Sequence, residues 1–123
     1  DEGKPIKLYG DGSQSRDFTY VDDIAEGSIK SLKKVGYEII NLGGGKNPIN
    51  LNTVIKMIEE KLGKKANIVH KEFQKTDMKQ TQADISKAKK IINWSPKIEF
   101  EEGLRRTIQW YNDNKSWLSK VEV

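Results

Sequence analysis

The sequence predicts a small domain of the α/β class, or equally of the α+β class, in which a small mixed sheet is flanked by helices. Short segments with alternating or continuous apolar residues are interleaved with longer segments whose apolar residues recur every three or four positions. Glycine, proline and asparagine separate these segments. The expected order is strand, strand, helix, strand, helix, strand, helix, helix, and a length of 123 residues allows one domain, residues 1–123.

The first elements are two short strands and a helix. Residues 5–9 alternate apolar and polar side chains before a glycine-containing turn, and residues 16–21 alternate again. The carboxylate of Asp22 or Asp23 can then cap a helix that runs to about Lys34, because it accepts hydrogen bonds from the free N–H groups of a first turn. The apolar face of this helix is expected to consist of Val21, Ile24, Ala25, Ile29 and Leu32.

The middle of the chain predicts a strand, a helix and a weaker strand. Residues 38–42 are typical of a buried strand and end at a run of three glycines. Asn50 caps the next helix, and Gly63 ends it. Residues 66–70 form the weaker strand. The helix has apolar residues at helical spacing, namely Leu51, Val54, Ile55, Ile58 and Leu62.

The last third predicts an irregular loop and two helices. Residues 71–83 are polar, and a short helix over residues 86–93 follows, with Asp84 as its cap. Pro96 separates this short helix from a final helix that begins near Phe100, because proline disfavours the interior of a helix. The apolar face of that helix is expected to hold Leu104, Ile108, Tyr111 and Leu118, and the core or a packing surface to hold Trp94, Trp110 and Trp117.

Composition excludes several classes of site. The chain has no cysteine, which excludes disulfides, thiolate zinc sites and a thiol nucleophile, and its one histidine, His70, reads as a strand residue without a chemical role. We therefore expect no metal site. Apolar runs fall far short of the roughly 20 residues of a membrane span, and no targeting segment is recognised, so we expect a cytoplasmic protein that does not bind membranes.

The charge balance invites a nucleic-acid interpretation, which the pattern does not favour. The net charge is 22 − 18 = +4 at pH 7. Nineteen of the 22 basic residues are lysines, and the three lysine pairs, at 33–34, 64–65 and 89–90, lie in separate segments without interleaved aromatic residues. This is typical of a solvated surface, and we expect no nucleic-acid partner.

Two short motifs are weak signals for cofactor chemistry. The glycines at 43–45 precede Lys46, but the spacing fits neither a P-loop nor a dinucleotide fingerprint, so a tight turn is the favoured interpretation. Tyr111 and Lys115 have the Tyr-x-x-x-Lys spacing of a short-chain dehydrogenase pair. Because two residues at one spacing recur by chance, we assign no catalytic residue.

Three longer blocks carry a family resemblance. Residues 10–24 read GDGSQSRDFTYVDDI, residues 81–96 contain ADISKA and NWSP, and residues 100–111 begin FEEGL. The blocks, in this order, resemble the extended short-chain dehydrogenases that act as NAD-dependent nucleotide-sugar epimerases and dehydratases. The NAD fingerprint and catalytic residues of that family precede the segment seen here. The resemblance therefore implies the C-terminal, substrate-binding subdomain of a Rossmann-type enzyme, with NAD bound by an N-terminal part absent from this chain.

The same resemblance implies a nucleoside-diphosphate sugar, usually with uridine, as the ligand. Arg16 matches the family's diphosphate-binding arginine, and guanidinium suits paired phosphate oxygens. Alternatively, Arg16 pairs with a nearby carboxylate such as Asp17 or Asp22. The strand that contains Lys7 and Tyr9 is placed beside the uracil, to be read by backbone groups, unless it is an ordinary edge strand.

The loop at 71–83 is expected to complete the sugar end of this site. Asp77 matches the family's ribose-binding aspartate. Gln74 stands where many relatives have a second arginine, and Thr81 where a side chain near the sugar is common. Gln74 hints at a uronic-acid epimerase, typified by UDP-glucuronate 4-epimerases, ahead of a UDP-glucose/galactose 4-epimerase. A solvated loop is the alternative for Gln74 and Thr81.

The expected function is the UDP-sugar-binding portion of an NAD-dependent nucleotide-sugar 4-epimerase. By family analogy, the sugar is oxidised at C4, turns in the site and is reduced again. The chain alone is expected to be inactive, and the full enzyme to be a homodimer. The alternatives are a 4,6-dehydratase or decarboxylase and a non-catalytic module that binds nucleotide sugars.

Overall fold

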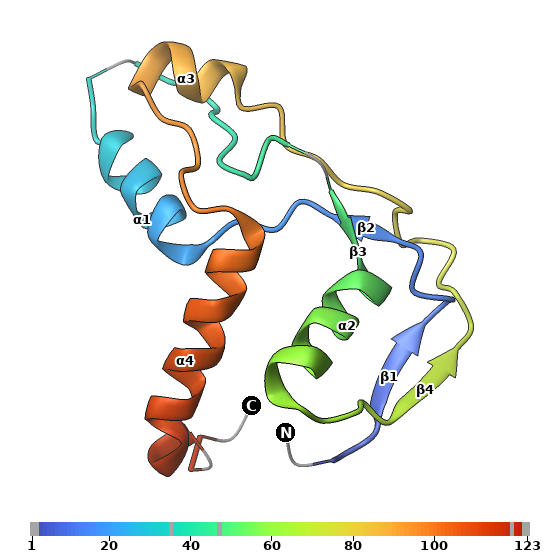
Figure 1. Ribbon diagram of the computed structural model, residues 1–123. Coiled ribbons are helices and arrows are strands. Elements are labelled where there is room, and N and C mark those ends of the chain that lie inside the picture. Colours follow the sequence, from blue (N-terminus) through green and yellow to red (C-terminus); the bar gives the residue numbers. More distant parts are fainter. Residues whose placement is uncertain (1–2, 35, 47, 119, 122–123) are drawn as a thin grey trace.

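The computed structural model describes residues 3–34, 36–46, 48–118 and 120–121, and it has the expected element order. Two groups of elements lie at opposite ends of the molecule, with the helices α1 and α3 at one end and α2 with the strands β1 and β4 at the other (Figure 1). The helices span Val21–Lys30 (α1), Leu51–Leu62 (α2), Ser86–Ile92 (α3) and Phe100–Leu118 (α4). None of these helices is long and apolar enough to span a membrane.

The strands form two small sheets, one parallel and one antiparallel. Ile6–Tyr9 (β1) pairs in parallel with Ile68–Lys71 (β4), so that Tyr9 lies opposite Lys71. Ser15–Arg16 (β2) pairs antiparallel with Ile49–Asn50 (β3) between the two ends of the molecule (Figure 1). The α/β class is confirmed, with the mixed strand directions divided between two sheets.

The helix α2 agrees with its sequence signals at both ends. The Asn50 side chain accepts a hydrogen bond from the Thr53 N–H at 2.8 Å, as a cap residue should. Gly63 ends the helix in the left-handed conformation at φ 63°, where a residue with a Cβ atom would be strained. The weak strand before His70 is also confirmed, one to two residues further along.

The expected strand at 38–42 is wrong, and so is most of the strand at 16–21. No strand forms within residues 36–46, and the third strand is β3 instead. Ile39 is 67% exposed, whereas Ile40 and Leu42 pack on the core. An apolar run indicates that a segment favours burial, but a strand forms only beside another segment whose backbone N–H and C=O groups are free to pair. The described residues offer none at this place.

The prediction for α1 was wrong in its cap, its length and its apolar face. Tyr20 is the N-cap and makes no side-chain capping bond. The helix ends at Lys30, because hydrogen bonds such as Leu32 N–H to Ile29 O at 3.1 Å tighten the following turn. The apolar residues Val21, Ile29 and Leu32 are 67%, 70% and 86% exposed.

Asp23, expected as a possible cap, is buried and joins α1 to the segment after α3. Its Oδ2 accepts hydrogen bonds from the backbone N–H groups of Lys97 at 3.1 Å and Ile98 at 2.9 Å. Its carbonyl oxygen accepts one from Trp94 Nε1 at 2.9 Å. The carboxylate therefore satisfies a loop distant in sequence instead of its own helix.

The main buried cluster lies around α3. It consists of Ile85, Ala88, Ile92 and Trp94, with Trp94 only 1% exposed. The other two tryptophans face outward on α4, where Trp110 is 51% and Trp117 45% exposed and their rings meet edge to face. Of the three, only Trp94 is in the core. The N-cap of α3 is Ile85, not Asp84 as expected, although Asp84 Oδ1 accepts from the first N–H of the helix, that of Ser86, at 2.9 Å.

Candidate functional site

Arg16 ends the short strand β2, and backbone oxygens fix one side of its guanidinium. Nη1 donates to the carbonyl oxygens of Ser15 and Met78, each at 2.9 Å. Nη2 donates to Oδ1 of Asp77 at 2.6 Å, which forms an ion pair across 61 positions of sequence. Neither Asp17 nor Asp22 is the partner, so the alternative of a nearby carboxylate is replaced by a distant one that was itself predicted as a site residue.

The loop that carries Asp77 is held against β2 by backbone hydrogen bonds. Ser15 N–H donates to the Lys79 carbonyl at 2.9 Å, and Thr81 N–H donates to the Ser15 carbonyl at 3.2 Å. Ser15 and Gln80 form an isolated parallel bridge. The segment 77–83 is thus a strap along β2, which brings Asp77 and Thr81 to the same short strand as Arg16.

Asp17 holds the far end of this strap, and sequence reasoning missed this role. Its Oδ2 accepts from the N–H groups of Gly45 at 3.0 Å and Ala83 at 2.9 Å. A Cβ atom on Gly44 would lie 2.1 Å from Oδ1 of Asp17. The close approach explains why glycine is needed here. The sequence signals for the contact between Asp17 and the glycine loop were the position of Asp17 next to the predicted Arg16 and the run of glycines at 43–45.

The glycine run packs against protein and leaves no phosphate cradle. A Cβ on Gly43 would meet Ala83 at 2.4 Å, and one on Gly45 would meet Ile85 at 2.5 Å. The Gly45 N–H is already bound to a carboxylate. The described residues therefore do not fit the pyrophosphate of NAD at this loop, in agreement with the favoured interpretation of a tight turn. Nor do three or more metal-ligating side chains of these residues gather into a metal site.

The strand β1 leads to the same region from the other side of the loop at 10–14. Lys7 and Tyr9 are both exposed, Tyr9 at 42%. The Tyr9 carbonyl accepts from Nε2 of Gln14 at 2.7 Å, so this oxygen already has one partner. Gln14 is 5% exposed, and its Oε1 has no hydrogen-bond partner among the described residues. Of the two predicted residues of β1, Tyr9 is the one with a structural link toward β2.

The six predicted side chains do not form one contact cluster. Arg16 and Asp77 touch, and the Thr81 backbone is bound beside them. Gln74 is exposed and contributes its carbonyl oxygen, which accepts from Asp77 N–H at 2.9 Å. In the described part of the chain, Lys7 and the Gln74 side chain make no hydrogen bond or ion pair with the Arg16–Asp77 pair.

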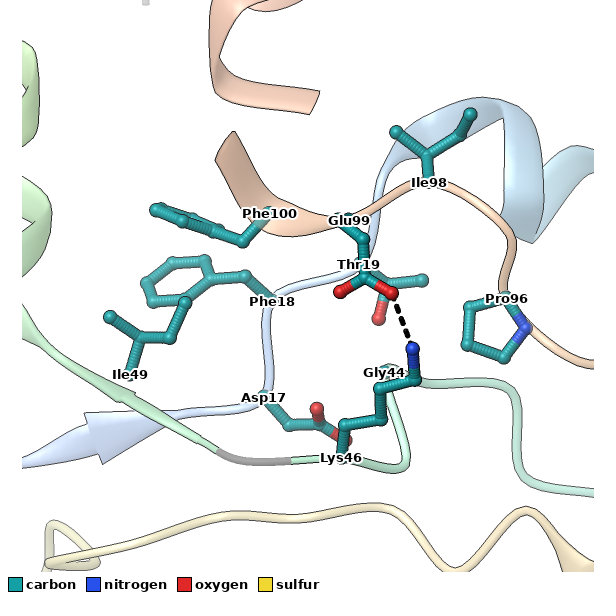
Figure 2. A pocket seen from close by; sticks show the side chains of 10 residues that line it. All are labelled: Asp17, Phe18, Thr19, Gly44, Lys46, Ile49, Pro96, Ile98, Glu99 and Phe100. Carbon is teal, nitrogen blue, oxygen red and sulfur yellow. Dashed lines mark hydrogen bonds and ion pairs between the residues drawn. The ribbon is translucent and has the colours of Figure 1, made fainter. Parts of the chain in front are cut away.

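Two pockets border β2. A pocket of about 460 Å³ is lined by the loop at 10–15 together with Phe73, Lys79 and Gln80. A second, of about 270 Å³, lies beyond Asp17 and has an apolar wall that includes Phe18 and Phe100. In this second pocket Lys46 and Glu99 reach toward each other and form an ion pair (Figure 2). The first pocket adjoins the strap and so lies next to the predicted nucleotide residues.

Local hydrogen bonds keep two carboxylates near these loops ionised. The hydroxyl and the backbone N–H of Ser13 both bind Asp11, at 2.6 Å and 2.9 Å, and lower its pKa below the usual value. Hydrogen bonds from the side chain and backbone of Ser86 lower the pKa of Asp84 in the same way. Both carboxylates therefore carry a negative charge at neutral pH.

Comparison with known proteins adds an independent line of evidence. Residues 1–107 match the family described as GDP-mannose 4,6 dehydratase. The chain is 57% identical over 122 residues to a UDP-glucuronate 4-epimerase of Thermodesulfobacterium geofontis, covering 99% of this chain and 38% of that protein. It is 33% identical over 119 residues to a UDP-N-acetyl-alpha-D-glucosaminuronate decarboxylase of Bacillus cytotoxicus, covering 91% of this chain and 37% of that protein.

The fold is also shared with solved structures. The structure of UDP-glucuronic acid 4-epimerase from Bacillus cereus, in complex with UDP-glucuronic acid and NAD, superposes with a TM-score of 0.80 and 36% identity. The match covers 91% of this chain and 36% of that one. The chain therefore spans less than two fifths of the length of these relatives.

Proposed function

Given that this chain belongs to the GDP-mannose 4,6-dehydratase family of extended short-chain dehydrogenases, we propose that it is the nucleotide-sugar-binding part of an NAD-dependent 4-epimerase. The proposed substrate is UDP-glucuronate. The observation that carries the proposal is the convergence of Arg16 and Asp77, 61 positions apart, on one short strand. The contact supports the proposal because a guanidinium, which suits phosphate oxygens, lies beside a carboxylate able to accept hydrogen bonds from two ribose hydroxyls.

Each residue of the proposed site has one task. Arg16 holds the diphosphate, Asp77 the ribose, and the backbone of β1 at Lys7 and Tyr9 the uracil edge. Gln74 and Thr81 face the sugar end. The Ser15 and Met78 carbonyls support the role of Arg16, because they fix the guanidinium in one orientation and so reduce the entropy lost on binding.

We propose that NAD and the catalytic groups belong to residues outside this chain. The glycine loop does not fit a pyrophosphate, and the relatives are more than twice as long as the chain. Ile29, Leu32, Tyr37 and Ile39 are exposed apolar side chains at the end of α1 and in the segment after it, and contact with such a neighbouring domain would cover them. By family resemblance the whole protein is a homodimer, and the absence of cysteine fits a reducing compartment such as the cytoplasm.

A decarboxylase or dehydratase is the second candidate, since a decarboxylase is among the relatives at 33% identity. Product analysis of a complete enzyme that contains this chain separates the three chemistries. An epimerase conserves the mass of the sugar, a decarboxylase releases CO₂ and a dehydratase releases water. Release of either molecule from UDP-glucuronate would contradict the 4-epimerase.

The direct test of the binding role is calorimetric titration of the chain with UDP and UDP-glucuronate. We expect saturable binding that weakens roughly 10- to 100-fold in Arg16→Ala, because charge-assisted hydrogen bonds contribute about 1.5–3 kcal/mol. Arg105→Ala is the matched control, since Arg105 pairs with Glu102 on α4 and its substitution removes the same charge elsewhere. Equal losses in both variants, or no binding at all, would contradict a nucleotide site built by this chain.

A further inference from the structure

We propose that the Arg16–Asp77 ion pair is a latch, in which the Asp77 carboxylate competes with the ligand's phosphate groups for the guanidinium. Binding of the diphosphate then opens the latch and releases Asp77 to the ribose. The inference rests on the proposed function, because it assumes that Arg16 is the phosphate-binding group. It adds that the site is closed by its own ribose-binding residue until a nucleotide arrives.

The hydrogen bonds of the guanidinium leave only one side for an anion. Both protons of Nη1 are directed to backbone oxygens, those of Ser15 and Met78, at 2.9 Å each. An incoming phosphate must therefore approach on the side of Nη2 and Nε. Asp77 already occupies Nη2 at 2.6 Å. A bidentate phosphate contact on that side thus requires Asp77 to give up or share its place.

The charge of the pair leads to the same conclusion. Carboxylate and phosphate are both anions, so they repel each other when both lie beside the same guanidinium. The side chains of Arg16 and Asp77 are 26% and 37% exposed, which makes solvent screening incomplete. Ligand binding must therefore overcome either an ion pair or an anionic neighbour, and the affinity measured for a phosphate is lower than Arg16 alone would provide.

The attachments of the strap confine the opening to one end. Backbone hydrogen bonds to Ser15 hold it at Lys79 and Thr81, and Asp17 holds it at Ala83. Asp77 lies before the first of these attachments, and its own N–H makes only a local bond, to the Gln74 carbonyl at 2.9 Å. The Met78 carbonyl is itself bound by Arg16 Nη1, so release of Asp77 moves residues 74–77 and leaves Met78 and the rest of the strap on β2.

Inorganic pyrophosphate is the probe that separates the latch from ribose binding, because it offers phosphate without a ribose. We would titrate the wild-type chain, Asp77→Asn and Glu72→Gln at one low ionic strength by calorimetry. The Asp77→Asn substitution keeps the shape of the side chain and removes its charge. Glu72 is exposed, lies in the same loop and is not among the hydrogen-bond partners described for Arg16, so Glu72→Gln removes an equal charge without touching the latch.

The latch predicts that Asp77→Asn binds pyrophosphate three- to tenfold more tightly than wild type, whereas Glu72→Gln changes the affinity less than twofold. For UDP the gain is smaller or reversed, because the same change weakens the ribose contact. An Asp77→Asn affinity for pyrophosphate equal to or below that of wild type overturns the latch. So does an equal gain in Glu72→Gln, which would indicate a general charge effect.

Arg16→Ala, alone and combined with Asp77→Asn, distinguishes failure of the latch from failure of the proposed function. If Arg16→Ala abolishes pyrophosphate binding but Asp77→Asn brings no gain, Arg16 holds phosphate and only the latch is wrong. If Arg16→Ala leaves the affinity unchanged in both backgrounds, or no chain binds pyrophosphate, then Arg16 is not a phosphate site and both proposals fail. Binding by Asp77→Asn alone would be the strongest support.

Discussion

The helices α1 and α2 have similar apolar patterns in the sequence but differ in how far their apolar faces are buried in the structure. The α2 helix keeps Val54, Ile55 and Ile58 partly buried and is capped at both ends. The α1 helix buries an aspartate and a glycine, Asp23 and Gly27, and exposes much of its apolar face. The comparison shows that hydrophobic periodicity identifies a face that needs cover, but does not say whether the cover lies in the same chain.

A substitution on the buried side of α1 should lower the stability of the chain more than one at the cap of α2 or on the exposed face of α1. Asp23→Ala removes the acceptor for the backbone N–H groups of Lys97 and Ile98 and leaves both unsatisfied. We expect a loss of about 2 kcal/mol in the free energy of unfolding, because two partly buried donors lose their partner and a fully buried one would cost about 1–3 kcal/mol. Urea unfolding monitored by circular dichroism measures it. Asp22→Ala, on the neighbouring exposed residue, is the control and should change little.

A loss below about 1 kcal/mol in Asp23→Ala would contradict this account, because water or another group would then satisfy the two donors. The fluorescence of Trp94 offers a second readout once the half-exposed Trp110 and Trp117 are both replaced by phenylalanine. Its Nε1 is bound to the Asp23 backbone, which the substitution keeps. The emission should therefore stay that of a buried indole while the folded state persists.

The cap of α2 should give a smaller effect. Asn50→Ala removes the side-chain oxygen that accepts from Thr53 N–H. We expect a loss of about 1 kcal/mol, which is typical of cap removal. Asn50→Asp should keep the stability, because a carboxylate caps equally well and favours the positive end of the helix dipole. A similar loss in Asn50→Asp and Asn50→Ala would mean that the side-chain oxygen is not the stabilising feature.

These differences explain which elements could be predicted. The bounds of α2 follow from Asn50 and Gly63, which act through contacts within a few residues. The cap of α1 could not be predicted correctly, because Asp23 serves N–H groups more than 70 positions away. The strand expected at 38–42 failed for a related reason. Its apolar sequence indicates that the segment favours burial. Strand pairing, however, depends on backbone groups of a neighbouring segment, which the described residues do not provide.

The candidate site was predicted by family resemblance more than by pattern. The family resemblance indicates Arg16 and Asp77 separately, and nothing in their spacing indicates that they touch. Their contact depends on the strap, which pairs with Ser15 through backbone groups and so leaves no mark in side-chain composition. Asp17 was considered only as a partner of Arg16. Because adjacent residues of an extended segment point to opposite sides, its carboxylate faces the glycine loop instead.

A substitution on the exposed face of α1 should change the free energy of unfolding least, and it tests the contrast between α1 and α2 directly. Ile29→Ser alters a side chain that is 70% exposed, so we expect a change within about 0.5 kcal/mol in the unfolding free energy of this chain. Ile58→Ser, the same change on the partly buried face of α2, should cost about 2 kcal/mol. Urea unfolding compares the free energies of unfolding of the two variants. A large loss in Ile29→Ser would mean that the chain covers this face itself, which would remove the reason to expect a neighbouring domain there.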